Sequence, residues 1–131
     1  MTHPARYIGL GINCPPDKAY EFASNPTNLP LWATGLGGSV TKEGNAWIAE
    51  SPMGRITIWF VKENEFGVLD HDVTLPSGQS FHNPMRIAKN GDGCEVIFTL
   101  YRLPGVTDDA FEKDAATIEG DLKKLKAILE K

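Results

Sequence analysis

His71 and Asn83 are the two side chains of this sequence best suited to chemistry inside an apolar environment. If the Pro-Ser-Gly stretch at 76–78 closes a hairpin, these two residues lie opposite each other on neighbouring strands. Side chains alternate along a strand, and their neighbours on the same face are apolar. A neutral imidazole can both donate and accept a proton, and an amide can donate and accept hydrogen bonds.

The pair supports three interpretations. A buried imidazole and amide need hydrogen-bond partners, so the two could be a satisfied core pair, or His71 could bond to the backbone of a helix. They could instead line a chamber and bind a ligand. In the third interpretation His71 is a catalytic proton shuttle and Asn83 holds an enolate oxygen. No orienting carboxylate is predicted on the same face, which weighs against catalysis.

The turns that set this register predict one self-consistent apolar face. A turn at 64–67 places Phe60 opposite His71, and a turn at 90–93 places Met85 opposite Phe98. The predicted inward residues are Ile56, Ile58, Phe60, Leu69, Val73, Leu75, Phe81, Met85, Ile87, Val96, Phe98 and Leu100. A long helix is the natural cover for such a face.

The order of predicted elements indicates an α+β fold in a single domain over residues 1–131. A strand at 5–13 precedes two short helices at 17–24 and 25–32. Six further strands follow, at 39–43, 46–51, 55–62, 68–75, 79–89 and 94–102. Residues 107–131 form a helix whose apolar stripe is Phe111, Ala115, Ile118, Leu122, Leu125 and Leu129. We therefore expect a helix-grip fold, in which a curved antiparallel sheet of about seven strands wraps the C-terminal helix.

Two tryptophans are predicted at the chamber. Trp47 faces inward if the Pro52-Met53 pair is a two-residue turn, and Trp32 ends the second short helix at the open end of the sheet. Aromatic residues there supply apolar contact and one N–H donor. Simple core packing explains each equally well. The glycine-rich stretch at 35–38 is interpreted as a flexible mouth.

The opposite face of the sheet carries a row of Trp59, Asp72, His82 and Tyr101. By residue type the row resembles an acid–base cluster. The favoured interpretation is an exposed cross-strand ion pair between Asp72 and His82. Large apolar groups on a water-facing surface suggest a contact between two copies of the chain. We therefore expect that a homodimer could form through Trp59 and Tyr101.

Several classes of function are not expected. A net charge of −4 and a pI of about 5.3 argue against nucleic-acid binding. The histidines at 3, 71 and 82 lack metal-ligand spacing, and no phosphate or dinucleotide motif occurs, so neither a metal nor a cofactor is predicted. No apolar run approaches the roughly 20 residues that span a membrane, and no signal peptide is apparent. Cys14 and Cys94 are expected to be free thiols of a cytoplasmic protein.

Several segments resemble START-like (SRPBCC) proteins across essentially the whole chain. Residues 12–16, 19–26 and 29–33 (INCPP, AYEFASNP and LPLWA) look like the opening of these proteins. Residues 91–100 and 121–126 (GDGCEVIFTL and DLKKLK) are similar to small bacterial members of the polyketide cyclase/dehydrase type. This superfamily shares a cavity rather than a catalytic motif.

The resemblance implies a cavity between the sheet, the long helix and the short helices that binds a small apolar or aromatic ligand. The residues expected to line it are Trp32, Trp47, Phe60, His71, Asn83, Met85 and Phe98. One alternative is a polyketide cyclase/aromatase-like enzyme that uses His71 and Asn83. Another is an interaction module like the Hsp90 activators, working through the outer face of the sheet.

Overall fold

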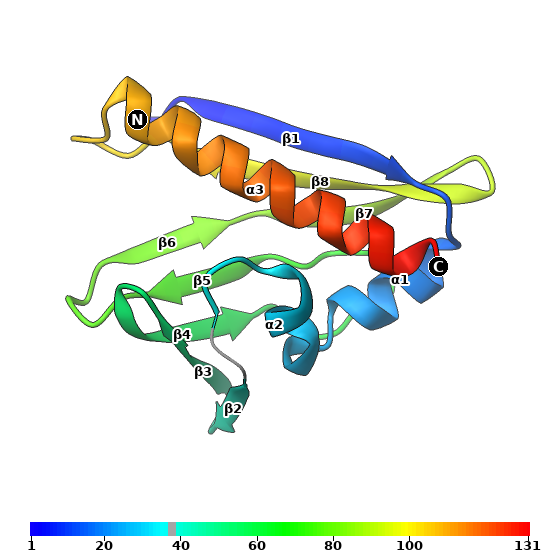
Figure 1. Ribbon diagram of the computed structural model, residues 1–131, viewed down its shortest axis with the longest axis horizontal. Helices are drawn as coiled ribbons and strands as arrows, with labels where there is room; N and C mark the ends of the chain where they lie inside the picture. The colour runs from blue at the N-terminus through cyan, green and yellow to red at the C-terminus, as the bar shows by residue number, and fades with distance from the viewer. Residues whose placement is uncertain (37–38) are drawn as a thin grey trace.

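The computed structural model describes residues 1–36 and 39–131, so the mouth predicted at 35–38 lies partly outside the described residues. The elements are β1 (Ala5–Ile12), α1 (Pro16–Ala23), the 3₁₀ turn η1 (Pro26–Asn28), α2 (Leu29–Trp32), β2 (Val40–Glu43), β3 (Ala46–Ser51), β4 (Gly54–Phe60), β5 (His71–Thr74), β6 (Ser80–Asn83), β7 (Met85–Asn90), β8 (Gly93–Tyr101) and α3 (Asp108–Leu129). Figure 1 shows them in chain order.

The strands form two antiparallel sheets with the order β1-β8-β7 and β2-β3-β4-β5-β6. The predicted register is confirmed, because His71 pairs with Asn83, Phe60 with His71, and Met85 with Phe98. The turn residues determined this register correctly, since a hairpin's loop length fixes which residues face each other.

The strand predicted at 79–89 is interrupted at Pro84, so the described residues form eight strands where about seven were expected. Proline has no N–H to donate to a sheet, and its ring restricts the backbone. The Pro84 carbonyl still accepts a hydrogen bond from the Thr99 N–H at 2.9 Å. The chain therefore turns a corner from one sheet into the other at this residue.

The two sheets are also joined by backbone hydrogen bonds between the residues just before β5 and strand β7. The Leu69 N–H donates to the Met85 carbonyl at 2.8 Å, and the Ile87 N–H donates to the Gly67 carbonyl at 2.9 Å. Gly67 has a φ of +75°, and a Cβ there would collide with the Ile87 carbonyl. Only glycine fits this close approach. The residues before β5 therefore connect the curved sheet across its bend.

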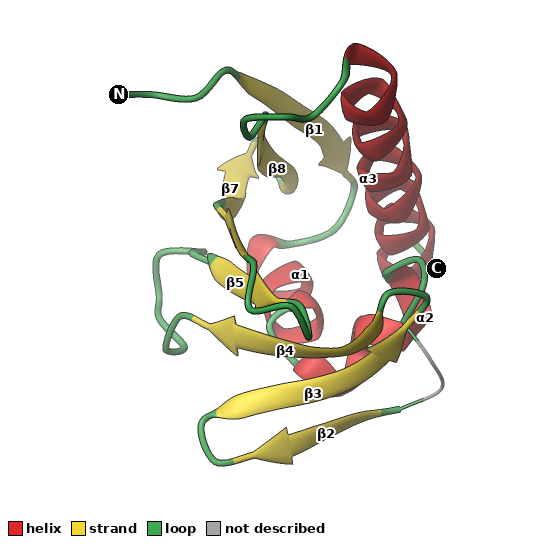
Figure 2. Cartoon of the chain, turned by 90° about the vertical axis from the view of Figure 1, so that its left-hand side faces the viewer, coloured by secondary structure: helices red, strands yellow, loops and turns green. Residues whose placement is uncertain are grey.

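The C-terminal helix α3 lies along the concave side of the molecule, close to β1 and, near its C-terminal end, to α2 (Figures 1 and 2). Of its predicted apolar stripe, Ile118 is half-buried. The other residues of the stripe are buried, namely Phe111, Ala115, Leu122, Leu125 and Leu129. The Thr107 hydroxyl accepts a hydrogen bond from the Ala110 N–H at 3.1 Å and caps the helix. Among the described residues, no helix is long and apolar enough to cross a membrane.

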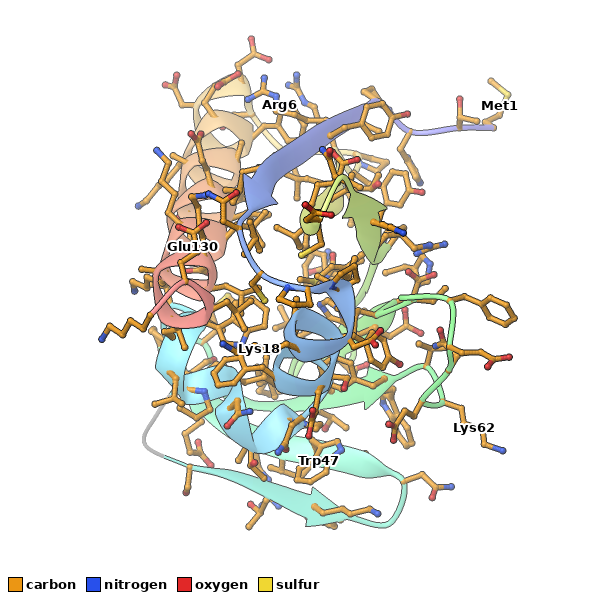
Figure 3. The ribbon with its side chains drawn as sticks, turned by 90° about the vertical axis from the view of Figure 1, so that its right-hand side faces the viewer. Met1, Arg6, Lys18, Trp47, Lys62 and Glu130 are labelled. Atoms are coloured by element: carbon orange, nitrogen blue, oxygen red, sulfur yellow. The ribbon has the colours of Figure 1, made fainter. Side chains whose placement is uncertain are left out.

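Polar contacts attach both ends of α3 to the segment around β1. Arg6 of β1 donates to Glu112 at 2.8 Å near the start of the helix, and the Asn13 N–H donates to Glu130 at 2.7 Å near its end. Arg6 and Glu130 are labelled in Figure 3. Arg6 also lies over the Phe111 ring, 5.0 Å from its centroid. The helix is thus held against the three-stranded sheet along its length.

The short helices follow the predicted order. Pro16 lies in the first turn of α1, where the missing N–H has no cost, and Ala19 and Ala23 of this helix are buried. The second predicted helix is a 3₁₀ turn followed by α2, with the Asn25 side chain accepting from the Thr27 N–H. Cys14 and Cys94 are both buried and free.

Candidate functional site

A pocket of about 180 Å³ lies between the curved sheet, α2 and α3. Its walls are almost entirely apolar, with one imidazole and two polar side chains among them. The lining residues are Ala23, Leu29, Trp32, Ala33, Thr34, Leu36, Ile56, Ile58, Phe60, Leu69, His71, Val73, Met85, Phe98, Ile118 and Asp121.

Strand alternation builds the sheet side of this pocket. Ile56, Ile58 and Phe60 are every second residue of β4 and point to the concave face, whereas Trp59 between them is 47% exposed on the other face. Leu69 and Met85, each 2% exposed, form the wall where the two sheets join. On the helix side, Ile118 belongs to the apolar stripe of α3.

His71 is the polar group on the sheet wall. Its Nδ1 lies 2.9 Å from the Leu69 carbonyl oxygen, and because a carbonyl can only accept, Nδ1 carries the hydrogen. Burial lowers the pKa of His71, outweighing the opposing effects of the bond to Leu69 and of the neighbouring carboxylates Asp70 and Asp72. The imidazole is therefore neutral near pH 7, with Nε2 as an acceptor.

The environment of Nε2 is aromatic and apolar. The Phe60 and Phe98 rings lie with their centroids 5.1 Å and 6.1 Å from that of His71, and all three residues line the pocket. Within the described part of the chain, Nε2 has no hydrogen-bond partner. Because His71 lines the pocket and its Nδ1 is bonded to Leu69, Nε2 is the acceptor that this side chain has left for a ligand.

Trp32 carries an unpartnered polar atom next to the pocket, on the helix side. The residue is 7% exposed, and its indole Nε1 is buried with no hydrogen-bond partner among the described residues. An unpartnered buried donor costs on the order of 1–3 kcal/mol.

Thr34 and Asp121 form the polar edge of the pocket. The Asp121 carboxylate accepts hydrogen bonds from the Thr34 N–H at 3.0 Å and from the Thr34 hydroxyl, and Lys124 donates to the same hydroxyl at 3.2 Å. Burial raises the pKa of Asp121, with the bonds from Thr34 and the charge of Lys124 opposing. These contacts attach Thr34, two residues after the end of α2, to α3 beside the pocket.

The pocket brings together most of the residues predicted to line a chamber. Trp32, Phe60, His71, Met85 and Phe98 all lie in its walls. They come from α2, β4, β5, β7 and β8, so the register of the sheet and the position of α2 determine the grouping.

Asn83 lies outside this pocket, although it pairs with His71 as predicted. It lines a second pocket of about 250 Å³ whose other residues are His3, Phe81, His82, Leu100, Tyr101 and Leu103. The interruption at Pro84 separates Asn83 from Met85, which stays at the first pocket. The predicted convergence of His71 and Asn83 on one chamber is therefore not what this structure shows.

Trp47 also lies outside the pocket. It pairs with Ile58 as the predicted turn requires, and it is half-buried against the core. Figure 3 shows it on the side of the molecule away from α3. β4 lies between β3 and the pocket in the sheet, so Trp47 packs against the core outside the pocket. This agrees with the core-packing interpretation of Trp47 in the sequence.

Sequence reasoning did not identify Thr34 and Asp121 as site residues. Asp121 lies one helical turn after Ile118, so its position beside the stripe was the one available signal. Thr34 gave no signal, because its contact with Asp121 joins residues 87 positions apart.

On the outer face of the sheet, Asp72 and His82 form the exposed cross-strand pair that was favoured from the sequence. His82 Nδ1 lies 2.6 Å from an Asp72 carboxylate oxygen, and both side chains are about half exposed. Such an exposed pair contributes little to stability. In the described part of the chain, no cluster of three or more His, Cys, Asp or Glu side chains is placed to hold a metal ion.

A larger groove of about 760 Å³, called the outer groove, lies outside the core, between α1, the β4–β5 connection and β7. Charged residues form much of its wall, including Asp17, Glu21, Glu63, Glu65, Arg86 and Lys89. Small-molecule sites are mostly apolar with few polar groups. The smaller pocket beside His71 is therefore the stronger candidate site.

The fold and the pocket define a START-like protein of the helix-grip class. The family described as "Polyketide cyclase / dehydrase and lipid transport" matches residues 11–130. The chain belongs to this family. The resemblance seen in the sequence is thereby confirmed.

Solved structures with the same fold share little sequence with the chain. The Aha1 dimer from Colwellia psychrerythraea has a TM-score of 0.78 at 16% identity, covering 97% of this chain and 96% of that one. An uncharacterised Bacillus thuringiensis protein has a TM-score of 0.76 at 14% identity, covering 96% and 98%. A START superfamily protein from Mycobacterium smegmatis has a TM-score of 0.72 at 10% identity, covering 96% and 97%. No curated protein matches the chain.

Proposed function

We propose that this protein binds a small apolar or aromatic molecule in the pocket between the sheet and α3. The observation that carries the proposal is an apolar pocket with the His71 imidazole in its wall, whose Nε2 has no hydrogen-bond partner among the described residues. A close-packed interior leaves few voids of this size, and polar atoms inside one normally have partners.

The volume restricts the size of the ligand. A cavity of about 150 Å³ holds one benzene molecule, whereas drug-sized ligands occupy about 300–1,000 Å³. At about 180 Å³, this pocket fits one ring with a small substituent. A folded poly-β-ketone chain is much larger, so the size favours binding of a small molecule over the cyclase/aromatase alternative.

Filling the pocket tests the proposal. Ala33 lines the pocket, and Ala88 lines the outer groove. We expect Ala33→Leu to weaken binding of p-cresol at least tenfold in isothermal titration calorimetry, because the added atoms occupy the ligand's space. Ala88→Leu is the matched control and should bind like the wild type.

If Ala88→Leu weakened the binding of p-cresol and Ala33→Leu did not, the ligand would bind in the outer groove, which would contradict the proposal. Mass spectrometry of small molecules extracted from the purified protein complements this test. We expect a molecule with a single ring to be recovered from the wild type and lost from Ala33→Leu.

The exposed sheet face supports a second candidate function, association with another protein molecule. Trp59 and Val61 are 47% and 43% exposed there, and Tyr101 is half-buried. The similar structure from Colwellia psychrerythraea is described as a dimer. If the face joins two copies, wild-type protein should sediment as a dimer and Trp59→Ser as a monomer. A monomeric wild type at high concentration would exclude this homodimer.

A further inference from the structure

We infer that the pocket selects a neutral single-ring phenol, whose hydroxyl donates its hydrogen bond to Nε2 of His71. This inference rests on the proposed function and specifies the chemical class of its ligand. Three features of the pocket carry it: the free acceptor, the charges of the lining residues and the volume.

The acceptor is oriented by the fold. Because Nδ1 of His71 donates to the Leu69 carbonyl at 2.9 Å, the ring is held with Nε2 on the edge away from that carbonyl. Phe60 and Phe98 lie next to the ring and line the same pocket, so a ligand bound there would lie against an aromatic and apolar wall beside Nε2. An apolar ligand without a donor would bury Nε2 unpaired, whereas a hydroxyl would satisfy it.

The charges of the lining residues favour a neutral ligand. Among the described residues of the lining, Asp121 is the one charged side chain, and no lysine or arginine is present. A carboxylate or phosphate would therefore lose its hydration without gaining a cation. Asp121 accepts from Thr34, whose hydroxyl also accepts from the Lys124 ammonium, so a cationic ligand at this edge would meet the positive charge of Lys124.

The volume and the wall chemistry favour an aromatic ring as the body of the ligand. One ring fills about 180 Å³ with little space left over. The walls from β4, β7 and α3 are aliphatic, with Ile56, Ile58, Met85 and Ile118 facing the space. A phenol combines this apolar body with a strong O–H donor at its edge.

Three ligands of nearly equal shape test the inference at pH 7: p-cresol, toluene and p-toluate. We expect p-cresol to bind the wild type about tenfold more tightly than toluene, the effect of about one hydrogen bond. p-Toluate should bind more weakly than toluene, since its charge has no partner. Affinities would be measured by titration calorimetry or by ligand-observed NMR.

Replacing the acceptor should remove the selectivity. His71→Phe keeps an aromatic ring in the wall, so toluene should still bind while the preference for p-cresol disappears. His82→Phe is the matched control, because His82 is exposed on the outer face. In the wild type, the His71 Nε2 resonance should shift with p-cresol and stay nearly unchanged with toluene, which tests the bond even if His71→Phe does not fold.

The outcomes separate this inference from the proposed function. Equal affinities for p-cresol and toluene, or tightest binding of p-toluate, would overturn the phenol assignment and leave a binding pocket. Failure of both neutral ligands to bind folded wild-type protein would overturn the proposed function as well.

Discussion

His71 combines two features: one ring nitrogen bonded to the Leu69 carbonyl just before its strand, and a second ring nitrogen without a partner among the described residues, in a side chain that lines an apolar pocket. The position of its side chain on the inward face of the sheet was predictable from the turns on either side of β5. The bond to the Leu69 carbonyl, which fixes the tautomer, was not, because it depends on how the backbone bends before the strand begins.

Burial of His71 should make stability depend on pH. The pKa of the folded-state imidazole is lowered, while the unfolded chain has an ordinary pKa of about 6.5. As pH falls below about 6.5, the unfolded state takes up a proton that the folded state does not, so stability decreases, by at most about 1.4 kcal/mol per pH unit. Urea unfolding between pH 7.5 and 5.5 would measure this loss.

The contribution of His71 is isolated by comparison with His71→Phe. Other titrating groups remain in both proteins, so the difference between their pH profiles reports this residue alone. We expect the variant to lose less stability than the wild type over the same range, with His82→Phe as the control. Parallel profiles would show that His71 is not buried in its neutral form.

Asp121 provides a prediction about the contact between α3 and Thr34. Asp121→Ala leaves the Thr34 N–H and hydroxyl without their acceptor, so we expect a loss of about 1 kcal/mol in the free energy of unfolding. Asp121→Asn keeps an acceptor oxygen and should lose less. Asp114→Ala, at an exposed position of the same helix, is the control.

Chemical denaturation measures these differences, and hydrogen exchange of the Thr34 amide locates them. Faster exchange at Thr34 in Asp121→Ala, compared with Asp114→Ala, is the expected local signature. A variant as stable as the wild type, with unchanged exchange, would show that the contact does not hold this segment.

At the scale of elements, α3 was the most predictable part of the fold. Its apolar stripe repeats with helical spacing, and Thr107 followed by acidic residues marks its start. The strands were predictable in register because their turns are local signals. The interruption at Pro84 was missed because apolar alternation continues on both sides of the proline, although a proline in a strand argues for a break.

Replacing Gly120, in the middle of α3, with alanine should stabilise the protein. A Cβ at this position meets no atom within 4 Å, and its φ lies outside the left-handed region. We expect Gly120→Ala to raise stability by about 0.5–1 kcal/mol, because glycine loses more backbone entropy in a helix. Ala116→Gly, at an exposed position of the same helix, should lower stability by a similar amount.

Thermal unfolding of the two variants measures the pair of effects. Opposite shifts of the melting temperature are predicted. A decrease in Gly120→Ala would mean that the space beside Gly120 is needed by another part of the protein.

For the whole molecule, the predicted helix-grip architecture is confirmed, but the predicted site is only partly reproduced. Residues on well-defined strands, such as Phe60 and Met85, lie at the pocket as expected. Asn83 is displaced by the bend at Pro84, and Trp47 lies beyond β4. Contacts between distant segments, such as Thr34 with Asp121, leave no local pattern, so only the folded structure shows them.

The central claim is that the pocket beside His71 is the binding site. NMR spectra of methyl groups during titration with p-cresol test it most directly, because isoleucines line both candidate regions. The account predicts shifts at Ile58 and Ile118 in the pocket, and unchanged signals for Ile87 and Ile97 at the outer groove. Shifts confined to Ile87 and Ile97, or none at all, would contradict it.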